Sequence, residues 1–305
     1  MKKVIITGGT GTVGKAFIEQ YYNKYKFYNF SRGEEKIAEL QRSYPKVNNI
    51  IGDICNLDKL INTFDKVKPD IVIHAAALKH VNLAELNPTQ TMDVNVLGSK
   101  NVVKASIRNR VPITIGISTD KACLPENVYG YSKKMMEMMF MEHHSKQTKF
   151  VCTRFANVAG SAGSVIPFWK NLALKGEALK LTDPKMNRLM FSKNEAAKLI
   201  QKAIDCTNEF IDPFVLSNIM NTVNMLDLAK NISNDIVIVG ARPGEKLNET
   251  LISDRELPYS YYSDKHGDYI FIFNKKQPSK FNFKKELSSA SAKVMNKSQI
   301  KKLIL

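Results

Sequence analysis

A short stretch of the chain, residues 118–133, carries polar side chains at positions that suit acid–base chemistry. Near its start lie Thr119, Asp120 and Lys121, directly after an apolar run that predicts a buried strand. An acid and an amine at the end of a strand can belong to an ordinary surface turn. A second pair of reactive residues follows closely in the sequence, which favours a functional interpretation. These three residues are therefore candidates for catalysis.

The second pair is Tyr129 and Lys133, which are four residues apart and share one face of a helix that starts near Val128. A phenol beside an ammonium can act as a base, because the positive charge favours the phenolate and lowers the tyrosine pKa. Helices also carry Tyr and Lys at this spacing by chance, as a surface tyrosine and a solvated lysine. The acid, the second lysine and the strand end just upstream favour the catalytic interpretation.

The chain begins with a strand, a glycine-rich loop and a helix, in the order typical of a dinucleotide-binding motif. Residues 4–6 are apolar, the loop follows at 7–14, and a helical pattern continues through Tyr22. Glycines in such a loop allow a tight turn, let backbone N–H groups approach a pyrophosphate, and let the helix contact the sheet. The loop residues expected to bind the cofactor are Gly8, Thr10, Gly11, Thr12, Val13 and Gly14.

The second predicted strand, residues 27–31, ends where the ribose of a bound adenosine would lie. The acidic residue that usually binds a free 2′-hydroxyl is missing, and Ser31 and Arg32 stand there instead. A guanidinium next to a hydroxyl suits a 2′-phosphate, and Lys36 adds a second cation one helical turn on. Although an ordinary loop also accommodates an arginine, the sequence favours NADP over NAD.

Two further apolar runs, at 49–53 and 70–77, predict the third and fourth strands. The first run ends where the edge of the cofactor's adenine would lie. The second run ends in small residues, which would let the cofactor pass close to the backbone. Small residues at a strand end can also serve packing alone. A helix that begins after Pro88 includes Asn95, another polar candidate for cofactor binding. The cofactor contacts expected from these elements are Asp53, Ile54, Ala75, Ala76, Ala77 and Asn95.

Strands that alternate with helices predict an α/β fold, a Rossmann doubly wound parallel sheet with a smaller C-terminal substrate-binding lobe. We expect residues 1–160 to bind NADP and to carry the catalytic residues, and residues 161–305 to form the nucleotide-sugar-binding lobe, intertwined with the first part. Within the lobe, Arg242 and Glu245 lie on a constrained turn. They could hold a phosphate and a sugar diol, or form a surface turn without function.

Composition limits the kinds of partner. The 305 residues have a net charge of +16, but the lysines are scattered and no basic tract is interleaved with aromatics, so nucleic acid is not expected. The four cysteines lack metal-binding spacing, which predicts no metal site and reduced thiols in a cytoplasmic protein. No signal peptide or membrane span is expected. A Met-rich segment at 135–141 predicts a homo-oligomer, a dimer through a helix bundle or a larger assembly.

Six motifs follow one another along the chain: T-G-G-T-G-x-x-G at 7–14, A-A-A-L-K-H-V at 75–81, S-T-D-K-A at 118–122, Y-G-x-x-K at 129–133, R-F-A-N-V-x-G-S-x-G-S-V at 154–165 and R-P-G-E-K at 242–246. Together they resemble the extended short-chain dehydrogenase/reductase family, and within it the UDP-N-acetylglucosamine 4,6-dehydratases that invert carbon 5. The most specific motif is Thr-Asp-Lys, because the glucose 4,6-dehydratases carry Thr-Asp-Glu there.

The resemblance implies a role for each polar residue of the 118–133 stretch. Tyr129 would take the proton of the sugar 4-hydroxyl while hydride passes to NADP, and Lys133 would hold the tyrosine and the nicotinamide ribose. Lys121 would then remove the proton from carbon 5, Asp120 would protonate the departing 6-hydroxyl, and Thr119 could bond the 4-oxygen. This requires a neutral lysine beside a protonated acid, whereas their attraction favours the opposite charges. Burial must offset that attraction, or the pair must titrate as one unit.

The resemblance also implies the ligands. NADP would stay tightly bound and be recycled in each turnover, and the substrate would be UDP-N-acetylglucosamine. The product would be UDP-2-acetamido-2,6-dideoxy-β-L-arabino-hexos-4-ulose, for surface glycan or modified-sugar biosynthesis. The substrate-binding residues that it implies are Lys79 near the diphosphate, Asn157, Arg188, Arg242 and Glu245.

Three other functions stay open on the sequence. An NAD(P)-dependent UDP-sugar 4-epimerase would keep Tyr129 and Lys133 but has no need of the pair formed by Asp120 and Lys121. A non-catalytic NADP-sensing binding protein would need neither pair. A 5-retaining dehydratase usually has an N-terminal membrane segment and Met in place of the tyrosine, so Tyr129 counts against it.

Overall fold

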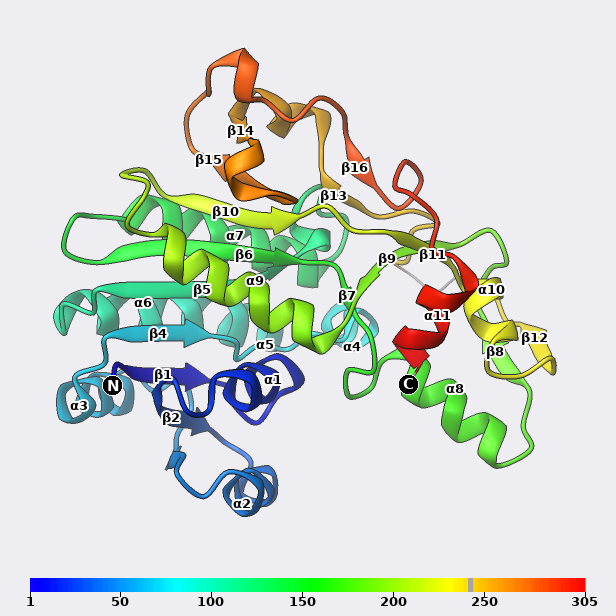
Figure 1. Cartoon of the computed structure of the whole chain (residues 1–305). Helices are drawn as coiled ribbons and strands as arrows, with labels where there is room; N and C mark the ends of the chain where they lie inside the picture. Colours follow the sequence, from blue (N-terminus) through cyan, green and yellow to red (C-terminus); the bar gives the residue numbers. More distant parts are fainter. Residues whose placement is uncertain (241–243, 305) are drawn as a thin grey trace.

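The computed structural model describes residues 1–240 and 244–304, and its centre is a nine-stranded sheet covered by helices (Figure 1). Its strands are β1 (Lys3–Thr7), β2 (Lys26–Ser31), β3 (Asn48–Ile51), β4 (Ile71–His74), β5 (Ile113–Thr119), β6 (Lys149–Phe155), β10 (Phe214–Asn218), β14 (Ser260–Tyr261) and β15 (Tyr269–Phe273). They are ordered β14-β15-β10-β6-β5-β4-β1-β2-β3. The strands from β3 to β10 run parallel, whereas β15 and β14 run antiparallel to their neighbours. The order from β3 to β6 confirms the predicted Rossmann sheet.

The central strands are apolar throughout because both faces of the sheet are covered. All seven residues of β5 are buried, including the three that end it, Ile117, Ser118 and Thr119. The register pairs Thr7 with His74, and Thr119 with Phe155. The carboxyl ends of these strands therefore meet at one edge, where the loops that follow them lie together.

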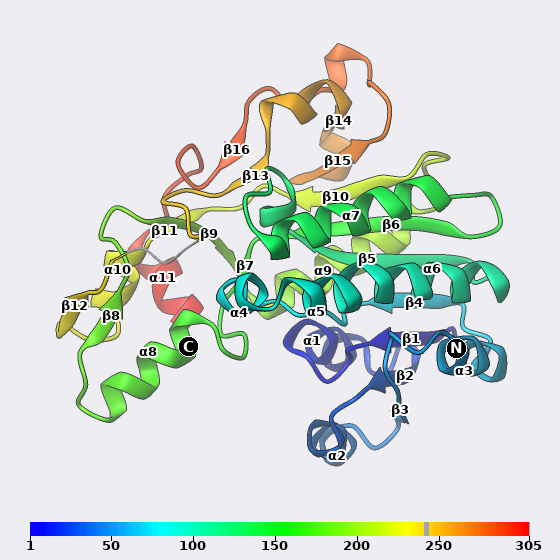
Figure 2. The same cartoon turned by 180° about the vertical axis from the view of Figure 1, so that it is seen from behind.

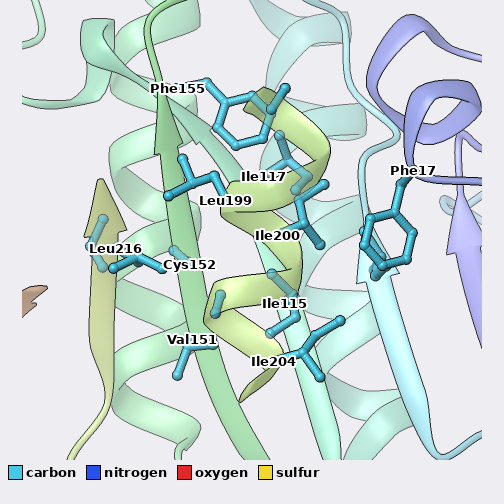
Figure 3. Close-up of a cluster of buried hydrophobic side chains, with 14 of the residues drawn as sticks. Phe17, Ile115, Ile117, Val151, Cys152, Phe155, Leu199, Ile200, Ile204 and Leu216 are labelled. Carbon is cyan, nitrogen blue, oxygen red and sulfur yellow. The ribbon is translucent and has the colours of Figure 1, made fainter. Parts of the chain in front are cut away.

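Helices cover both faces of the sheet, as Figures 1 and 2 show. On one face α1 (Thr12–Tyr21) packs against α9 (Lys193–Cys206), and on the other lie α3 (Leu57–Val67), α6 (Gly98–Arg108) and α7 (Val128–His143). Another helix, α2 (Glu34–Ser43), follows β2 at the edge. In Figure 3, Leu199, Ile200 and Ile204 of α9 lie over apolar residues of β5 and β6. This packing fixes α9 although it comes from the C-terminal half of the chain.

The helix that was expected after Pro88 is not continuous. It consists of α5 (Pro88–Met92), a turn of π-helix at Asp93–Leu97 (η1) and then α6. The wider turn of a π-helix changes the direction in which side chains leave the axis, and such turns are frequent at functional sites. Asn95 lies within this turn and is buried.

A smaller lobe lies at the carboxyl edge of the sheet and has a core of its own, with Trp169 buried at its centre. Its elements are β7 (Asn157–Val158), α8 (Val165–Leu174), β8 (Leu179–Leu181), β9 (Asn187–Phe191), β11 (Thr222–Asn224), α10 (Met225–Lys230), β12 (Ile236–Ile238) and α11 (Lys297–Ile304). Because α9, β10, β14 and β15 also follow residue 160, a boundary there does not separate the sheet from the lobe. The domain division stays a prediction.

The remaining elements are short connections. They are α4 (Val81–Leu86), the 3-10 turns η2 (Asp120–Ala122), η3 (Asp254–Tyr259), η4 (Asp264–His266) and η5 (Ser279–Phe281), and the strand pair β13 (Thr250–Ile252) and β16 (Leu287–Ser288). Within the described ranges, no helix has both the length and the apolar character needed to span a bilayer.

Candidate active site

A cleft of about 1750 Å³ runs along the carboxyl edge of the sheet, between the loops that follow the parallel strands and the smaller lobe. A site for one drug-sized ligand usually measures roughly 300–1,000 Å³, so this cleft has room for two large ligands. Most residues that the sequence singled out line it: Gly8, Thr10, Gly11, Thr12, Val13, Gly14, Ser31, Arg32, Lys36, Asp53, Ile54, Ala75, Ala76, Ala77, Lys79, Thr119, Asp120, Lys121, Tyr129, Lys133, Asn157 and Glu245.

The glycine loop after β1 leaves room for a ligand but none for a side chain. Gly8 has a φ of +75°, and a Cβ atom on it would lie 2.8 Å from the Cα atom of Ala76. Its amide donates a hydrogen bond to the carbonyl oxygen of Phe30 at 2.8 Å, which fixes the turn. The helix α1 begins at Thr12, so its first N–H groups lie at the cleft, where they suit the pyrophosphate of a dinucleotide.

At the far end of the cleft, the residues after β2 form a polar corner. Ser31 accepts a hydrogen bond from Thr10 at 3.4 Å, and the guanidinium of Arg32 lies 3.3 Å from the Asp53 carboxylate. Burial would raise the pKa of Asp53, but the amide of Cys55 and the guanidinium outweigh it and lower that pKa. The Arg32 side chain is 57% exposed and can turn toward a ligand. Glutamates in the first turn of α2 line this corner too, so the choice of NADP over NAD stays a prediction.

Asn95 does not line the cleft, among the described residues, although the sequence placed it with the cofactor contacts. It lies behind the wall of the cleft and forms hydrogen bonds with the backbone of Leu78 and with Ser132. Its influence on a ligand would therefore act through residues 75–79.

The turn η2 places two reactive side chains directly after β5. Oδ1 of Asp120 accepts hydrogen bonds from the Thr119 hydroxyl and from the Lys121 amide, both at 2.8 Å, and lies 3.2 Å from the Lys121 ammonium nitrogen. The other oxygen, Oδ2, is buried and accepts from no donor among the residues that the structure describes. The two oxygens of this carboxyl group thus have very different surroundings.

The helix α7 begins against the backbone of this turn. Asn127 caps the helix by accepting a hydrogen bond from the amide of Gly130 at 2.8 Å. A Cβ atom at Gly130 would collide with the carbonyl oxygen of Lys121, so only glycine allows this close approach. The contact holds Tyr129 and Lys133 at the same end of the cleft as Asp120, as the sequence predicted.

The ionisation of Tyr129 differs from the expectation. Burial raises its pKa to about 12, and the cation that opposes this rise is Lys121 rather than Lys133. Burial also lowers the pKa of Lys133 to about 8. The predicted lowering of the tyrosine pKa by Lys133 is therefore absent, because loss of hydration at the phenol is the larger effect.

Glu249, just before β13, is a residue of the site to which no sequence motif pointed. Its Oε1 atom lies 2.8 Å from the Lys121 ammonium nitrogen, and its Oε2 atom accepts a hydrogen bond from Asn157 at 3.0 Å. It could have been suspected from its place four residues after Glu245, because that segment had already been singled out.

The pair that was expected after β5 is therefore a triad, in which Asp120 suits its expected role and Lys121 does not. Burial and the charge of Glu249 raise the pKa of Asp120 to about 7, which suits an acid. Burial would lower the pKa of Lys121, but its two carboxylate neighbours outweigh burial and raise it above the ordinary value. This direction is opposite to the one needed for a neutral lysine.

The expected sugar-binding residues are only partly brought together. Lys79 lies at the cleft and its ammonium donates a hydrogen bond to the carbonyl oxygen of Ala162 at 2.8 Å. Arg188 is buried, and its guanidinium donates to the carbonyl oxygens of Asn187, Lys246 and Leu247. These hydrogen bonds hold β9 to residues 246–247, just before Glu249. Within the described part of the chain, Arg188 does not line the cleft. Arg242 lies outside the described residues.

One trio of residues with metal-binding side chains lies outside the lining of the cleft. It consists of Cys206, Glu209 and His266. The ammonium of Lys265 lies 2.7 Å from the Glu209 carboxylate, where it competes with a cation.

Comparisons with known proteins agree with the geometry. The family model described as "Polysaccharide biosynthesis protein" matches residues 4–274. A UDP-N-acetylglucosamine 4,6-dehydratase (inverting) of Campylobacter jejuni is 37% identical over 275 residues, which cover 85% of this chain and 80% of that protein. A UDP-glucose 4-epimerase of Rickettsia rickettsii is 36% identical, with 84% and 79% covered. The X-ray structure of Pen from Bacillus thuringiensis superposes with a TM-score of 0.89 at 29% identity, covering 99% and 96%.

Proposed function

The chain belongs to the polysaccharide biosynthesis protein family, within the extended short-chain dehydrogenases/reductases, and we propose from this that it is an NADP-dependent UDP-N-acetylglucosamine 4,6-dehydratase that inverts carbon 5. The family contains nucleotide-sugar dehydratases and epimerases, so the proposal concerns which reaction takes place. The observation that carries it is the position of Asp120 and Lys121, which line the same cleft as Tyr129 and Lys133. An epimerase has no use for this additional acid and amine.

The first half of the reaction needs a base at carbon 4. Tyr129 would accept the proton of the 4-hydroxyl in its phenolate form, with Thr119 bonded to the 4-oxygen and Lys133 holding the tyrosine and the nicotinamide ribose. Since burial raises the pKa of Tyr129 to about 12, the phenol must first lose its own proton. NADP, when bound, supplies reversible hydride transfer, from carbon 4 of the sugar at first and to carbon 6 at the end. The cleft that the glycine loop and Ala76 line supports binding of such a dinucleotide.

The second half is the loss of water across carbons 5 and 6. A ketone at carbon 4 acidifies the hydrogen on carbon 5, and Asp120 would protonate the departing 6-hydroxyl. Its pKa, raised to about 7, supports this role, because the acid keeps its proton at pH values where an ordinary aspartate has lost it. Lys121 would remove the proton from carbon 5. Since the triad favours its ammonium form, its own proton must first pass to a neighbouring group.

The product class tests the proposal. The protein is incubated with UDP-N-acetylglucosamine in D₂O without added reductant, and the product is followed by NMR. We expect a 4-keto-6-deoxy sugar with inverted, L-configured carbon 5, UDP-2-acetamido-2,6-dideoxy-β-L-arabino-hexos-4-ulose, with deuterium at carbon 5. Retained D-configuration would contradict inversion, and solvent deuterium in place of the transferred hydride at carbon 6 would contradict internal recycling of NADP.

A UDP-sugar 4-epimerase is the second candidate, favoured by the similarity to proteins named UDP-glucose 4-epimerase. In the same experiment it would return a 4-epimer that keeps its 6-hydroxyl. A non-catalytic NADP-sensing protein would leave the sugar unchanged while still binding NADP. One NMR series with a binding titration therefore separates the three.

We also propose a homo-oligomer and a cytoplasmic location. Met135 and Met138 on α7 are 43% and 54% exposed, which supports a packed helix interface with a second copy. Free thiols at all four cysteines support a reducing compartment. The end product would serve surface glycan or modified-sugar biosynthesis.

A further inference from the structure

We propose that Glu249 is a positioning residue of the reaction, a fixed negative charge that holds the Lys121 ammonium and leaves the proton of the acid on Asp120. The inference rests on the proposed function, because it gives Asp120 the role of the acid. It assigns no contact with substrate to Glu249, which acts through its two neighbours.

The contacts of Glu249 are those of a carboxylate that stays ionised. Its Oε1 atom lies 2.8 Å from the Lys121 nitrogen and 3.6 Å from Nε of Arg188. Its Oε2 atom accepts from the Asn157 amide at 3.0 Å, and its own backbone amide donates to the Ser289 hydroxyl at 2.9 Å. Two cations and a neutral donor around one buried carboxylate stabilise its charged form. The pKa of Glu249 accordingly lies below its ordinary value.

Asp120 has the opposite character. Three donors converge on Oδ1, whereas Oδ2 is buried and accepts from no donor among the described residues. A hydrogen bond between Asp120 and the Glu249 carboxylate forms only when Asp120 carries the proton. A buried, unpartnered carboxylate oxygen is costly when charged and much less so when it carries a proton. Oδ2 is therefore the place for a transferable proton, and Asp120 is one of the residues that line the cleft.

The surrounding charges support this division. Asp120 faces Lys121 and Glu249, and its pKa is raised to about 7 by burial, then by the charge of Glu249, against the pull of Lys121. Lys121 faces Asp120, Glu249 and Arg188. The Tyr129 phenol is also near Asp120 and Lys121, but it is neutral at these pH values because its pKa is about 12. Lys121 is shared by two carboxylates and lies nearer to Glu249, so Asp120 is the one left to bind a proton.

The substitution Glu249→Gln removes the charge and keeps the shape of the side chain, although one accepting oxygen becomes a donating NH2 group. The carboxyl carbons of aspartate are labelled with ¹³C in the full-length protein without sugar, and Asp120 is assigned by its disappearance in Asp120→Asn. We expect Asp120 to titrate near pH 7 in the wild type. In Glu249→Gln its midpoint should fall by about one pH unit or more, since a like charge is lost and Lys121 then pairs with Asp120 alone.

A matched control is Glu126→Gln, which removes a carboxylate from an ion pair with Lys246 at 2.8 Å near the same rim. The Asp120 midpoint should not move in this variant. If Glu249→Gln fails to fold, as judged by circular dichroism, Glu249→Asp retains the charge and withdraws it by one methylene. That variant should lower the midpoint in the same direction and by less. An unchanged midpoint in the folded Glu249 variant overturns the inference.

Kinetics provide a readout that a merely structural role would not change. In the dehydratase assay, the loss of rate at alkaline pH should begin about one unit lower in Glu249→Gln, because the acid form of Asp120 is lost earlier. A uniform fall in rate at every pH would mean that Glu249 only supports the fold. If the wild-type protein does not convert UDP-N-acetylglucosamine, the proposed function fails, and the titration still decides the role of Glu249.

Discussion

Asn95 pairs with the backbone of Leu78 in both directions. Its Oδ1 atom accepts a hydrogen bond from the Leu78 amide at 2.8 Å, and its Nδ2 atom donates to the Leu78 carbonyl at 2.9 Å. The side chain thereby takes the place of a neighbouring strand where β4 has already ended. It holds the segment whose residues 75–79 line the cleft.

Asn95→Ala should therefore weaken both the fold and cofactor binding. The amide and the carbonyl of Leu78, which are only partly buried, lose their partner, and this should cost less than the roughly 1–3 kcal/mol of a fully buried group left unsatisfied. Denaturant unfolding and an NADP titration by fluorescence measure the two effects. Asn109→Ala is the control, because its amide bonds within α6, at Ala105, outside the lining of the cleft. Unchanged NADP affinity in Asn95→Ala would mean that residues 75–79 keep their place in the cleft without the two hydrogen bonds between Asn95 and Leu78.

Tyr129→Phe should remove turnover and keep NADP binding, since only the hydroxyl is lost. A positioned base contributes roughly 10²–10⁴-fold, and the rate of the dehydratase assay should fall by that factor. Tyr131→Phe, two residues along the same helix and 55% exposed, is the matched control and should leave the rate unchanged. Turnover within about tenfold of wild type would identify another group as the base.

Arg32→Asp should weaken NADP by about 1.5–3 kcal/mol, the range of a charge-assisted hydrogen bond, and leave NAD nearly unchanged. The exposure of Arg32 to solvent places the effect toward the lower end. The control is Arg42→Asp in the last turn of α2, where the guanidinium donates to the Ala38 carbonyl. Equal affinity of the wild type for NAD and NADP, measured by calorimetry, would remove the basis of this prediction.

Arg154→Met should destabilise the protein by about 3–5 kcal/mol, the cost of leaving buried charges without a partner. Its side chain is 1% exposed and bonds both Glu137 and Glu256, at 2.8 and 2.9 Å. Unfolding in urea measures the loss. Lys275→Met, which breaks a pair with Asp212 whose lysine is 63% exposed, should cost about 0–1 kcal/mol. A loss of that small size in Arg154→Met would contradict the prediction.

The same cluster predicts a pH dependence of stability. Burial would raise the pKa of Glu256, but Arg154 outweighs it and lowers the pKa from 4.5 to about 2. Because the folded value is the lower one, the stabilisation is complete above pH 4.5 and is lost as the pH falls toward 2. Urea unfolding between these pH values should show a smaller acid-induced loss in Arg154→Met than in the wild type.

The sheet could be predicted because its strands are continuous apolar runs and its first loop has glycines at positions that only glycine can occupy. β1 and β2 lie where these patterns placed them, whereas β3 and β4 end before the predicted residues 53 and 77. The π-helical turn could not be predicted from local propensity, and the hydrogen bond between its Asn95 and Leu78 forms only in the folded chain. Local propensity contains no information of that kind.

The candidate site could be predicted where neighbouring residues act together, and not where the chain returns from a distance. Asp120 and Lys121 are adjacent in sequence, whereas Glu249 reaches them from a segment more than a hundred residues away. The Glu249 carboxylate changes the ionisation of Asp120 and Lys121. The local motif alone could therefore not show whether Lys121 is neutral. Arg188 similarly supports the turn before Glu249 through backbone carbonyls that no pattern reveals.

The place of β10 between β6 and β15 has a consequence for how the protein is made. A ribosome releases the N-terminal part first, at roughly 5–20 residues per second, so β1 to β6 emerge well before β10 can join them. During that interval β6 is an unpaired edge, and the face later covered by α9 is exposed. Unpaired apolar edges associate with other chains. Chaperone binding to the nascent chain is therefore expected to be strongest while residues 156–218 are being synthesised.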